Sequence, residues 1–174
     1  AIDALSHLLE GIYSVKTEPL LYPIIFEGIK LIYENLQECL DQPLNIQIRE
    51  KLMQAAFYGG LVIAQTGTTL QHSIGYPLTT EYGITHGCSN GIVMKDIMEL
   101  FYFARKNEID NLFTYMGIQR QDFYNWLISL NLVNDNFIDN NLLEAHIKKV
   151  AASSNIANNP IQVSTESIRK IYEK

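Results

Sequence analysis

The sequence predicts an all-α protein, a multi-helix bundle in one domain spanning residues 1–174. Three observations support this class. Apolar residues recur every three or four positions along much of the chain, the period of an amphipathic helix. No segment shows a convincing strand pattern, and nothing resembles a strand–helix alternation. A chain of 174 residues, 47% of them hydrophobic, also carries enough apolar material for a sizeable core.

The first helices are expected at about residues 3–13, 19–40 and 48–63. The second is predicted by an apolar stripe and is ended by Asp41 to Pro43; the stripe consists of Leu21, Ile25, Ile29, Ile32, Leu36 and Leu40. The third carries the small residues Ala55, Ala56, Gly59 and Gly60, which let another backbone come close. We therefore expect this third helix to be buried on several sides.

Six further helices are expected in the rest of the chain. Their approximate ranges are 69–78, 87–103, 108–116, 122–130, 142–151 and 165–173. Residues 131–141 are rich in Asn and Asp, and residues 153–159 are small and polar, so both are predicted to be surface connections. Neither is long enough to suggest a second domain.

Composition excludes several classes of function. The formal net charge is −6 and Lys and Arg form no basic run, so nucleic acid is not an expected partner. No apolar run approaches the roughly 20 residues of a membrane span, and no signal core follows the N-terminus. Cys39 and Cys88 lack metal or disulfide spacing, which favours a reducing compartment. We expect a soluble cytoplasmic protein.

Asp3 and His7 are the first candidate metal ligands. A spacing of four on a helix puts both side chains on one face, one turn apart, where they can hold one cation. Taken alone, a chance pair or a surface hydrogen bond is the commoner explanation of such a spacing. Asp3 could also be a helix N-cap.

His72 and His86 are the second pair of candidates. His72 lies in a helical stretch, and a glycine-containing connection before His86 could bring the two imidazoles together. A hydrogen-bonded core histidine and a helix-start residue are the ordinary alternatives. From the residues alone, both interpretations stay open. The remaining histidine, His146, lies in a polar helix and is expected to face solvent.

The order DALxHxxE, HxxGYPL and then HG before another helix resembles the iron-containing alcohol dehydrogenases. The resemblance covers nearly the whole chain, to the closing STESIRKIYEK. It implies the C-terminal helical, metal-binding domain of a two-domain fold shared with dehydroquinate synthase, with Asp3, His7, His72 and His86 as ligands. It further implies that the metal, Fe(II) by resemblance, polarises the oxygen of a small alcohol or aldehyde for hydride transfer to or from NAD or NADP. Zinc, manganese or nickel would also suit these ligands.

The N-terminal nucleotide-binding domain implied by the resemblance has no counterpart in this sequence, which lacks a glycine-rich phosphate loop. Because residue 1 is Ala and the first motif starts at once, we expect the chain to be part of a longer protein, inactive as a dehydrogenase by itself. A homodimer is a possible assembly.

One position departs from the family pattern. The position four residues after His72 is Tyr76 in this chain. The family often has a further His at that position, where it is thought to help move the proton. Tyr76 is retained as a catalytic or pocket-lining candidate, with an ordinary structural Tyr as the alternative. Glu10 is a candidate contact behind the ligands or with another domain, although an exposed carboxylate is the favoured interpretation. Gly83 and Gly87 are expected to serve the backbone geometry around His86.

Three alternatives remain. A glycerol dehydrogenase or dehydroquinate synthase shares the two-domain plan, but resembles this chain less because its ligand set has fewer histidines. A helical metal-binding domain without catalysis is the alternative outside the enzymes. A helical phosphohydrolase is disfavoured, because no His-Asp dipeptide occurs.

Overall fold

A computed structural model of the chain describes residues 1–132 and 140–173, and within these ranges the expected all-α class is confirmed. The described residues form helices and connections, with no strand among them. The helices are α1 (Ile2–Tyr13), α2 (Tyr22–Asp41), α3 (Ile46–Thr66), α4 (Leu70–Tyr82), α5 (His86–Ile92), α6 (Met94–Phe101), α7 (Lys106–Met116), α8 (Arg120–Ser129), α9 (Asn140–Ala151) and α10 (Thr165–Tyr172), with short 3-10 helices η1 (Pro19–Leu21) and η2 (Ser154–Asn158). No helix in the described ranges is both long and apolar enough to cross a bilayer.

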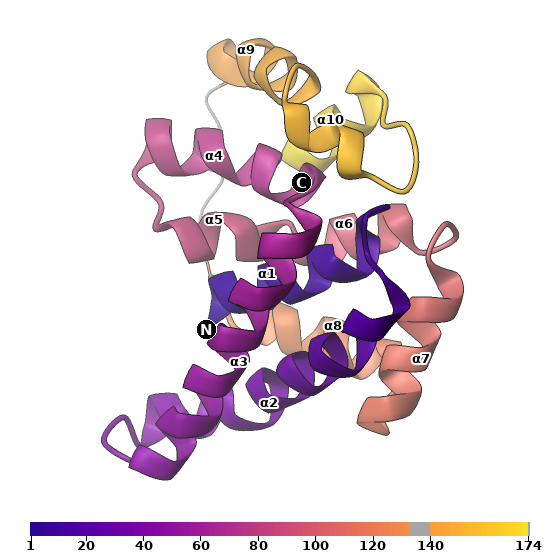
Figure 1. Cartoon of the computed structure of the whole chain (residues 1–174). Helices are drawn as coiled ribbons and strands as arrows, with labels where there is room; N and C mark the ends of the chain where they lie inside the picture. The colour runs from indigo at the N-terminus through magenta and orange to yellow at the C-terminus, as the bar shows by residue number, and fades with distance from the viewer. Residues whose placement is uncertain (133–139, 174) are drawn as a thin grey trace.

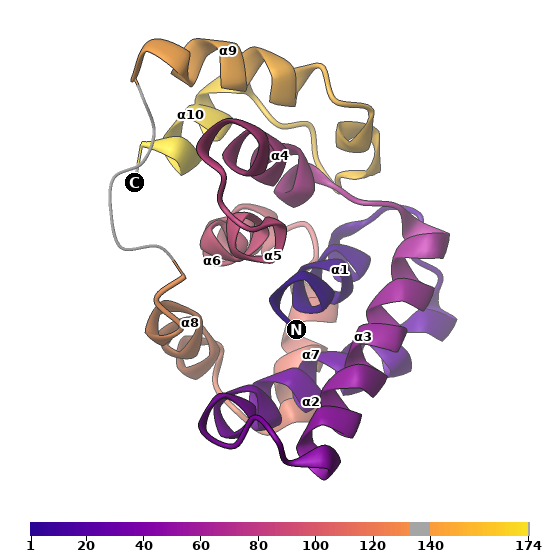
Figure 2. The ribbon, with the colours of Figure 1, turned by 90° about the vertical axis from the view of Figure 1, so that its left-hand side faces the viewer.

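Helix α1 lies at the centre of the molecule. It packs against α2, α3 and α5, as Figures 1 and 2 show, and most of its side chains are buried. Leu5, Leu8, Leu9 and Ile12 are completely buried. The helix that carries the first motif is therefore held on several sides.

Helix α3 is not buried on several sides, contrary to the expectation. Gly59 does face α1: a Cβ there would lie 3.0 Å from the carbonyl oxygen of Ala4. On the opposite side, a Cβ on Gly60 would meet nothing within 4 Å beyond its own helix, and Met53 and Phe57 are 68% and 63% exposed. Small residues indicate how closely one neighbour approaches, but not how many neighbours there are.

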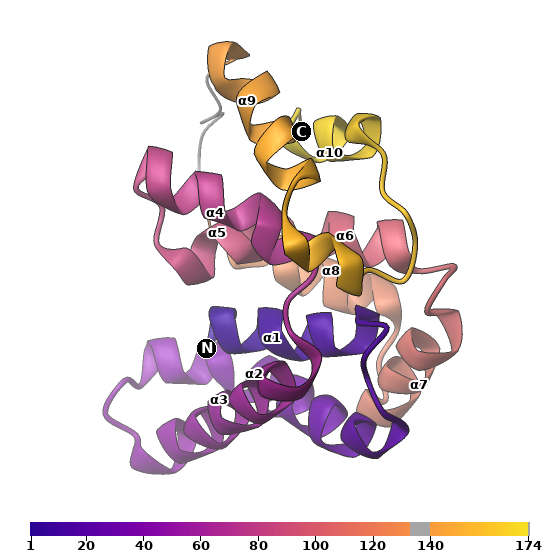
Figure 3. The same ribbon diagram turned by 45° about the horizontal axis from the view of Figure 1, so that its top comes forward.

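Helices α4, α5 and α6 form a second layer, with α9 and α10 beyond α4 (Figure 3). The single helix expected at 87–103 is two helices, α5 and α6, joined at Val93, whose φ and ψ are −97° and −1°. Glycines 87 and 91 weaken the helix before this break. The change of direction leaves His86 beside α1 while α6 buries Met94, Ile97 and Phe101 in the core.

One polar segment is more buried than predicted. Part of the expected surface connection 153–159 is inside: Asn158 and Asn159 are only 6% and 7% exposed. Asn159 Oδ1 accepts a hydrogen bond of 2.9 Å from the backbone N–H of Leu70, and so caps α4. Most of the connection expected at 131–141 lies outside the described residues.

His146 does not face solvent, so that prediction was wrong. It is fully buried, and its Nε2 lies 2.7 Å from a carboxylate oxygen of Glu81. It belongs to the buried stripe of α9, together with Leu143, Ile147 and Val150. A polar helix still presents one apolar face, and His146 lies on it.

Candidate metal centre

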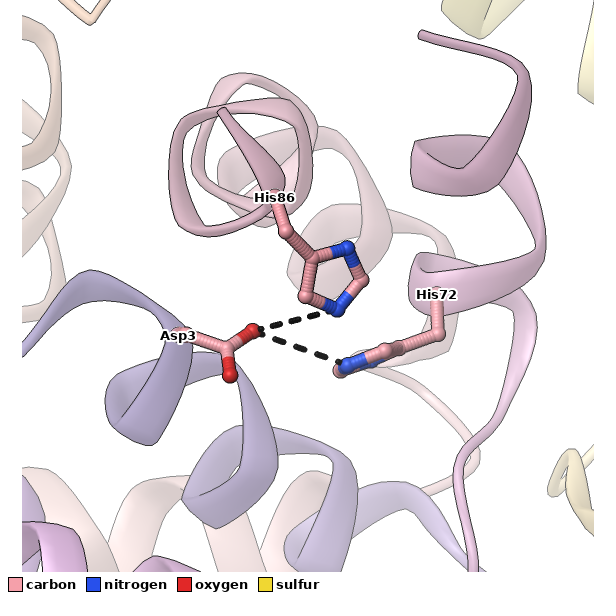
Figure 4. A group of neighbouring side chains, drawn as sticks. All are labelled: Asp3, His72 and His86. Carbon is pink, nitrogen blue, oxygen red and sulfur yellow. Dashed lines mark ion pairs between the residues drawn. The ribbon is translucent and has the colours of Figure 1, made fainter. Parts of the chain in front are cut away.

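Three side chains from three helices meet at one point (Figure 4). Asp3 comes from the first turn of α1, His72 from the start of α4, and His86 is the first residue of α5. One potential ligand atom from each lies within 4.8 Å of the other two. His72 is 2% exposed, whereas Asp3 and His86 are 37% and 39% exposed, so the point is closed on the His72 side and open on the other.

The separations suit a small cation. Asp3 Oδ1 lies 3.7 Å from His72 Nε2 and 3.5 Å from His86 Nε2. Ligands about 2.1 Å from one tetrahedral ion are about 3.4 Å apart. Asp3 is therefore within a few tenths of an ångström of the separation it needs to share one ion with either histidine, and the ligand atoms of the two histidines lie within 4.8 Å of each other.

Asn90 provides a second test of whether a cation fits. Its amide nitrogen lies 3.0 Å from Asp3 Oδ1, 3.1 Å from His72 Nε2 and 3.3 Å from His86 Nε2. That nitrogen carries two hydrogens, and it is surrounded by the Asp3 oxygen and two ring nitrogens, each of which is an acceptor in the tautomer that has its proton on Nδ1. The point is rich in lone pairs, and a cation there can be held by all three acceptors at once. Asn90 was missed in the sequence, although its position four after His86 on a helix was the available signal.

His7 lies beside this group rather than within it. Its Nε2 is 3.5 Å from Asp3 Oδ2, the carboxylate oxygen that faces away from the other two histidines, and its ring stacks on His72 with centroids 5.1 Å apart. Burial lowers the pKa of His7 from its ordinary value of 6.5, although the nearby Asp3 carboxylate opposes the shift. At neutral pH its imidazole is therefore uncharged and has a lone pair to offer.

Glu10 is completely buried, so the favoured interpretation of an exposed carboxylate was wrong. One of its oxygens accepts from the N–H and hydroxyl of Thr69, both at 2.7 Å, and from the N–H of His72 at 3.2 Å. Its other oxygen contacts His72 Nδ1. Glu10 thus lies directly behind the histidine, on the side away from Asp3 and His86.

Two glycines shape the backbone around His86. Gly83 ends α4 in the left-handed conformation with φ of +67°, which turns the chain back toward α1. A Cβ on Gly87 would lie 3.2 Å from the backbone nitrogen of Asp3. The absence of a side chain there allows α5 to approach the start of α1 closely.

Tyr76 borders the group but does not lie among its ligand atoms. Its ring stacks on His86, with centroids 5.8 Å apart and planes 9° from parallel, and meets His72 edge-on. It also lines a pocket of about 340 Å³ between α4 and the end of α9, together with Ser73, Pro77, Thr80, Lys149, Ser153 and Ser154. Tyr76 therefore contacts His86 and also lines the neighbouring pocket.

Comparison with known proteins gives one consistent result. The family model described as "Fe-containing alcohol dehydrogenase family, C-terminal" matches residues 1–174. An iron-containing alcohol dehydrogenase structure from Thermotoga maritima is 35% identical with a TM-score of 0.88, over 99% of this chain and 46% of that one. Long-chain-alcohol dehydrogenase 1 of Geobacillus thermodenitrificans is 26% identical over 116 residues, 67% of this chain and 29% of that protein.

Maleylacetate reductase 1 of Rhodococcus opacus is similar over a longer range, with 20% identity across 99% of this chain and 49% of that protein. The chain thus spans at most about half the length of these relatives.

Proposed function

Because the chain belongs to the Fe-containing alcohol dehydrogenase family, we propose that it is the metal-binding part of an iron-dependent alcohol dehydrogenase. The observation that carries this proposal is the convergence of Asp3, His72 and His86 on one point. His7 is the proposed fourth ligand, because its imidazole, whose pKa is lowered by burial, already lies 3.5 Å from the Asp3 carboxylate.

A divalent ion held by these residues would supply a Lewis acid for the oxygen of a small alcohol or aldehyde in hydride transfer to or from NAD or NADP. The protein residues hold that ion in a half-open site. His72 is fixed in the interior, and the exposed sides of Asp3 and His86 leave room for the substrate oxygen. Fe(II) is favoured by the family, although nitrogen and oxygen ligands of this kind also accept zinc.

Tyr76 is proposed to contact the substrate. Its hydroxyl can donate a hydrogen bond, and its ring lies between the His86 ligand and the adjoining pocket. The nicotinamide cofactor is proposed to bind mainly to an N-terminal nucleotide-binding domain outside these 174 residues.

The proposal is tested by measuring metal content after anaerobic loading with Fe(II), in the unchanged chain and in four variants. We expect Asp3→Ala, His72→Ala and His86→Ala each to lose most of the bound iron, and His7→Ala to bind it more weakly. His146→Gln is the matched control, because it changes the one histidine outside the site. Helical content is checked by circular dichroism. Undiminished iron in all four alanine variants would defeat the assignment.

A further inference from the structure

We propose that Glu10 is a positioning residue that fixes the tautomer of His72, so that its Nε2 lone pair points at Asp3 and His86. This inference rests on the proposed function for its metal, but its structural part concerns the imidazole alone. It assigns a role to a buried carboxylate that binds no ion itself.

Glu10 is held rigidly in a position that suits this role. It lies two helical turns after Asp3 on α1, so one helix carries both a ligand and the residue behind another ligand. Its Oε1 accepts three hydrogen bonds, two from Thr69 and one from the backbone of His72. These bonds prevent rotation of the carboxylate and leave Oε2 facing His72 Nδ1.

The tautomer follows from hydrogen-bond chemistry on both sides of the ring. A carboxylate oxygen can only accept, so Nδ1 of His72 must carry the proton that it shares with Glu10. On the other edge, the Asn90 amide points its nitrogen at His72 Nε2, 3.1 Å away. That amide cannot be reversed without placing its oxygen against Asp3 Oδ1, which is 3.0 Å from the nitrogen. Nε2 is therefore the acceptor.

Burial makes this contact effective. Glu10 is fully buried and His72 is 2% exposed, so water does not compete for Nδ1. A neutral imidazole with its proton on Nε2 would have no lone pair directed at the ligand group. A carboxylate behind the ring also makes Nε2 a stronger donor to a metal.

The decisive variant is Glu10→Gln, which keeps the size of the side chain. The amide oxygen of glutamine can take the place of Oε1 and keep all three of its hydrogen bonds. Its NH2 group then faces His72 Nδ1, which must become the acceptor, and the ring proton moves to Nε2. Thr69→Val is the matched control, because it removes one hydrogen bond to Oε1 and leaves the contact with Nδ1 intact.

Two measurements are made on each protein. The first is the 15N spectrum of His72 without metal, which reports which ring nitrogen carries the proton. We expect the proton on Nδ1 in the unchanged chain and in Thr69→Val, and on Nε2 in Glu10→Gln. The second is the affinity for Fe(II) or Zn(II), expected to fall about 10–100-fold in Glu10→Gln and little in Thr69→Val.

A proton on Nε2 in the unchanged chain would overturn the inference, even if Glu10→Gln does not fold. Equal metal affinity in Glu10→Gln and the unchanged chain would also overturn it. An unchanged chain that binds no metal, but has His72 protonated on Nδ1, would refute the proposed function and uphold the role of Glu10 in setting the tautomer.

Discussion

Replacing Gly11 by Ala should loosen the packing that holds α1, the helix of Asp3 and Glu10. A Cβ there would lie 2.4 Å from Val62 Cγ1 and 3.1 Å from Ile25 Cδ1. Carbon atoms pack at about 3.5 Å or more, so α1 and α3, the helix of Val62, must separate by about 1 Å. Val62 cannot turn away, because it is completely buried and β-branched residues have one preferred rotamer in a helix.

The expected destabilisation is about 1–2.5 kcal/mol, because the 2.4 Å contact with a fixed methyl group puts the overpacking cost at about 2–3 kcal/mol. Overpacking in general costs about 1–3 kcal/mol, and the better helix propensity of Ala returns about 0.5–1 kcal/mol. The free energy of unfolding is measured by urea denaturation followed by circular dichroism. Gly60→Ala is the control: no atom lies within 4 Å of that site, so this variant should gain about 0.5–1 kcal/mol.

A double variant isolates the contact. In a Val62→Ala background the obstructing methyl group is gone, so adding Gly11→Ala should cost less than it does alone. Two results would refute this reasoning. One is a Gly11→Ala variant as stable as the unchanged chain; the other is a double variant whose loss of stability equals the sum of the two single losses. Either would mean that α1 and α3 do not approach as closely at Gly11 as the structure indicates.

Four other predictions are tested more simply. Zn(II) at about 100 times its dissociation constant should stabilise the chain by about 2.7 kcal/mol, seen as a higher melting temperature that a chelator reverses. Hydrogen bonds from Lys149 and His146 lower the pKa of Glu81 below 4.5, so the stability they confer should be lost as the pH falls through that lowered pKa; a pH titration in which Glu81→Gln behaves like the unchanged chain would contradict this. Tyr76→Ala should bind as much iron as the unchanged chain, because Tyr76 stacks on the proposed ligand His86 and is not itself a proposed ligand. The 174-residue chain by itself should bind metal and show no NAD-linked alcohol oxidation, and turnover by the purified chain would refute this.

Local periodicity was sufficient to predict most of the helices, but it failed at the boundary between α5 and α6, which tertiary packing decides. The four-residue spacing of Asp3 and His7 indicated one helix face, and the structure has them paired. The break at Val93 was not predictable in the same way, because an apolar stripe continues through it. It arises from the need to place His86 against α1 while α6 enters the core.

The residues that surround the proposed ligands were harder to predict than the approach of Asp3, His72 and His86 to one another. A Glu on a helix is usually solvated. Glu10 is buried because α4, which begins about 60 residues later in the sequence, starts beside it. Asn159 caps the same helix from still farther along the sequence. His146 was misjudged from the overall polarity of its helix, whereas its spacing from Leu143 and Val150 already indicated the buried face.

The distribution of Asp3, His72 and His86 over α1, α4 and α5 has a consequence for the folding of the chain. Asp3 and His72 are about 70 residues apart in the sequence. One metal ion bound to both would close a long loop and would reduce the conformational entropy of the unfolded chain. The start of α1 and the start of α4 should then open together or not at all. Amide hydrogen exchange at the start of α1 and at the start of α4 should therefore slow in parallel when metal is added. The metal would act as a removable cross-link between the two helices.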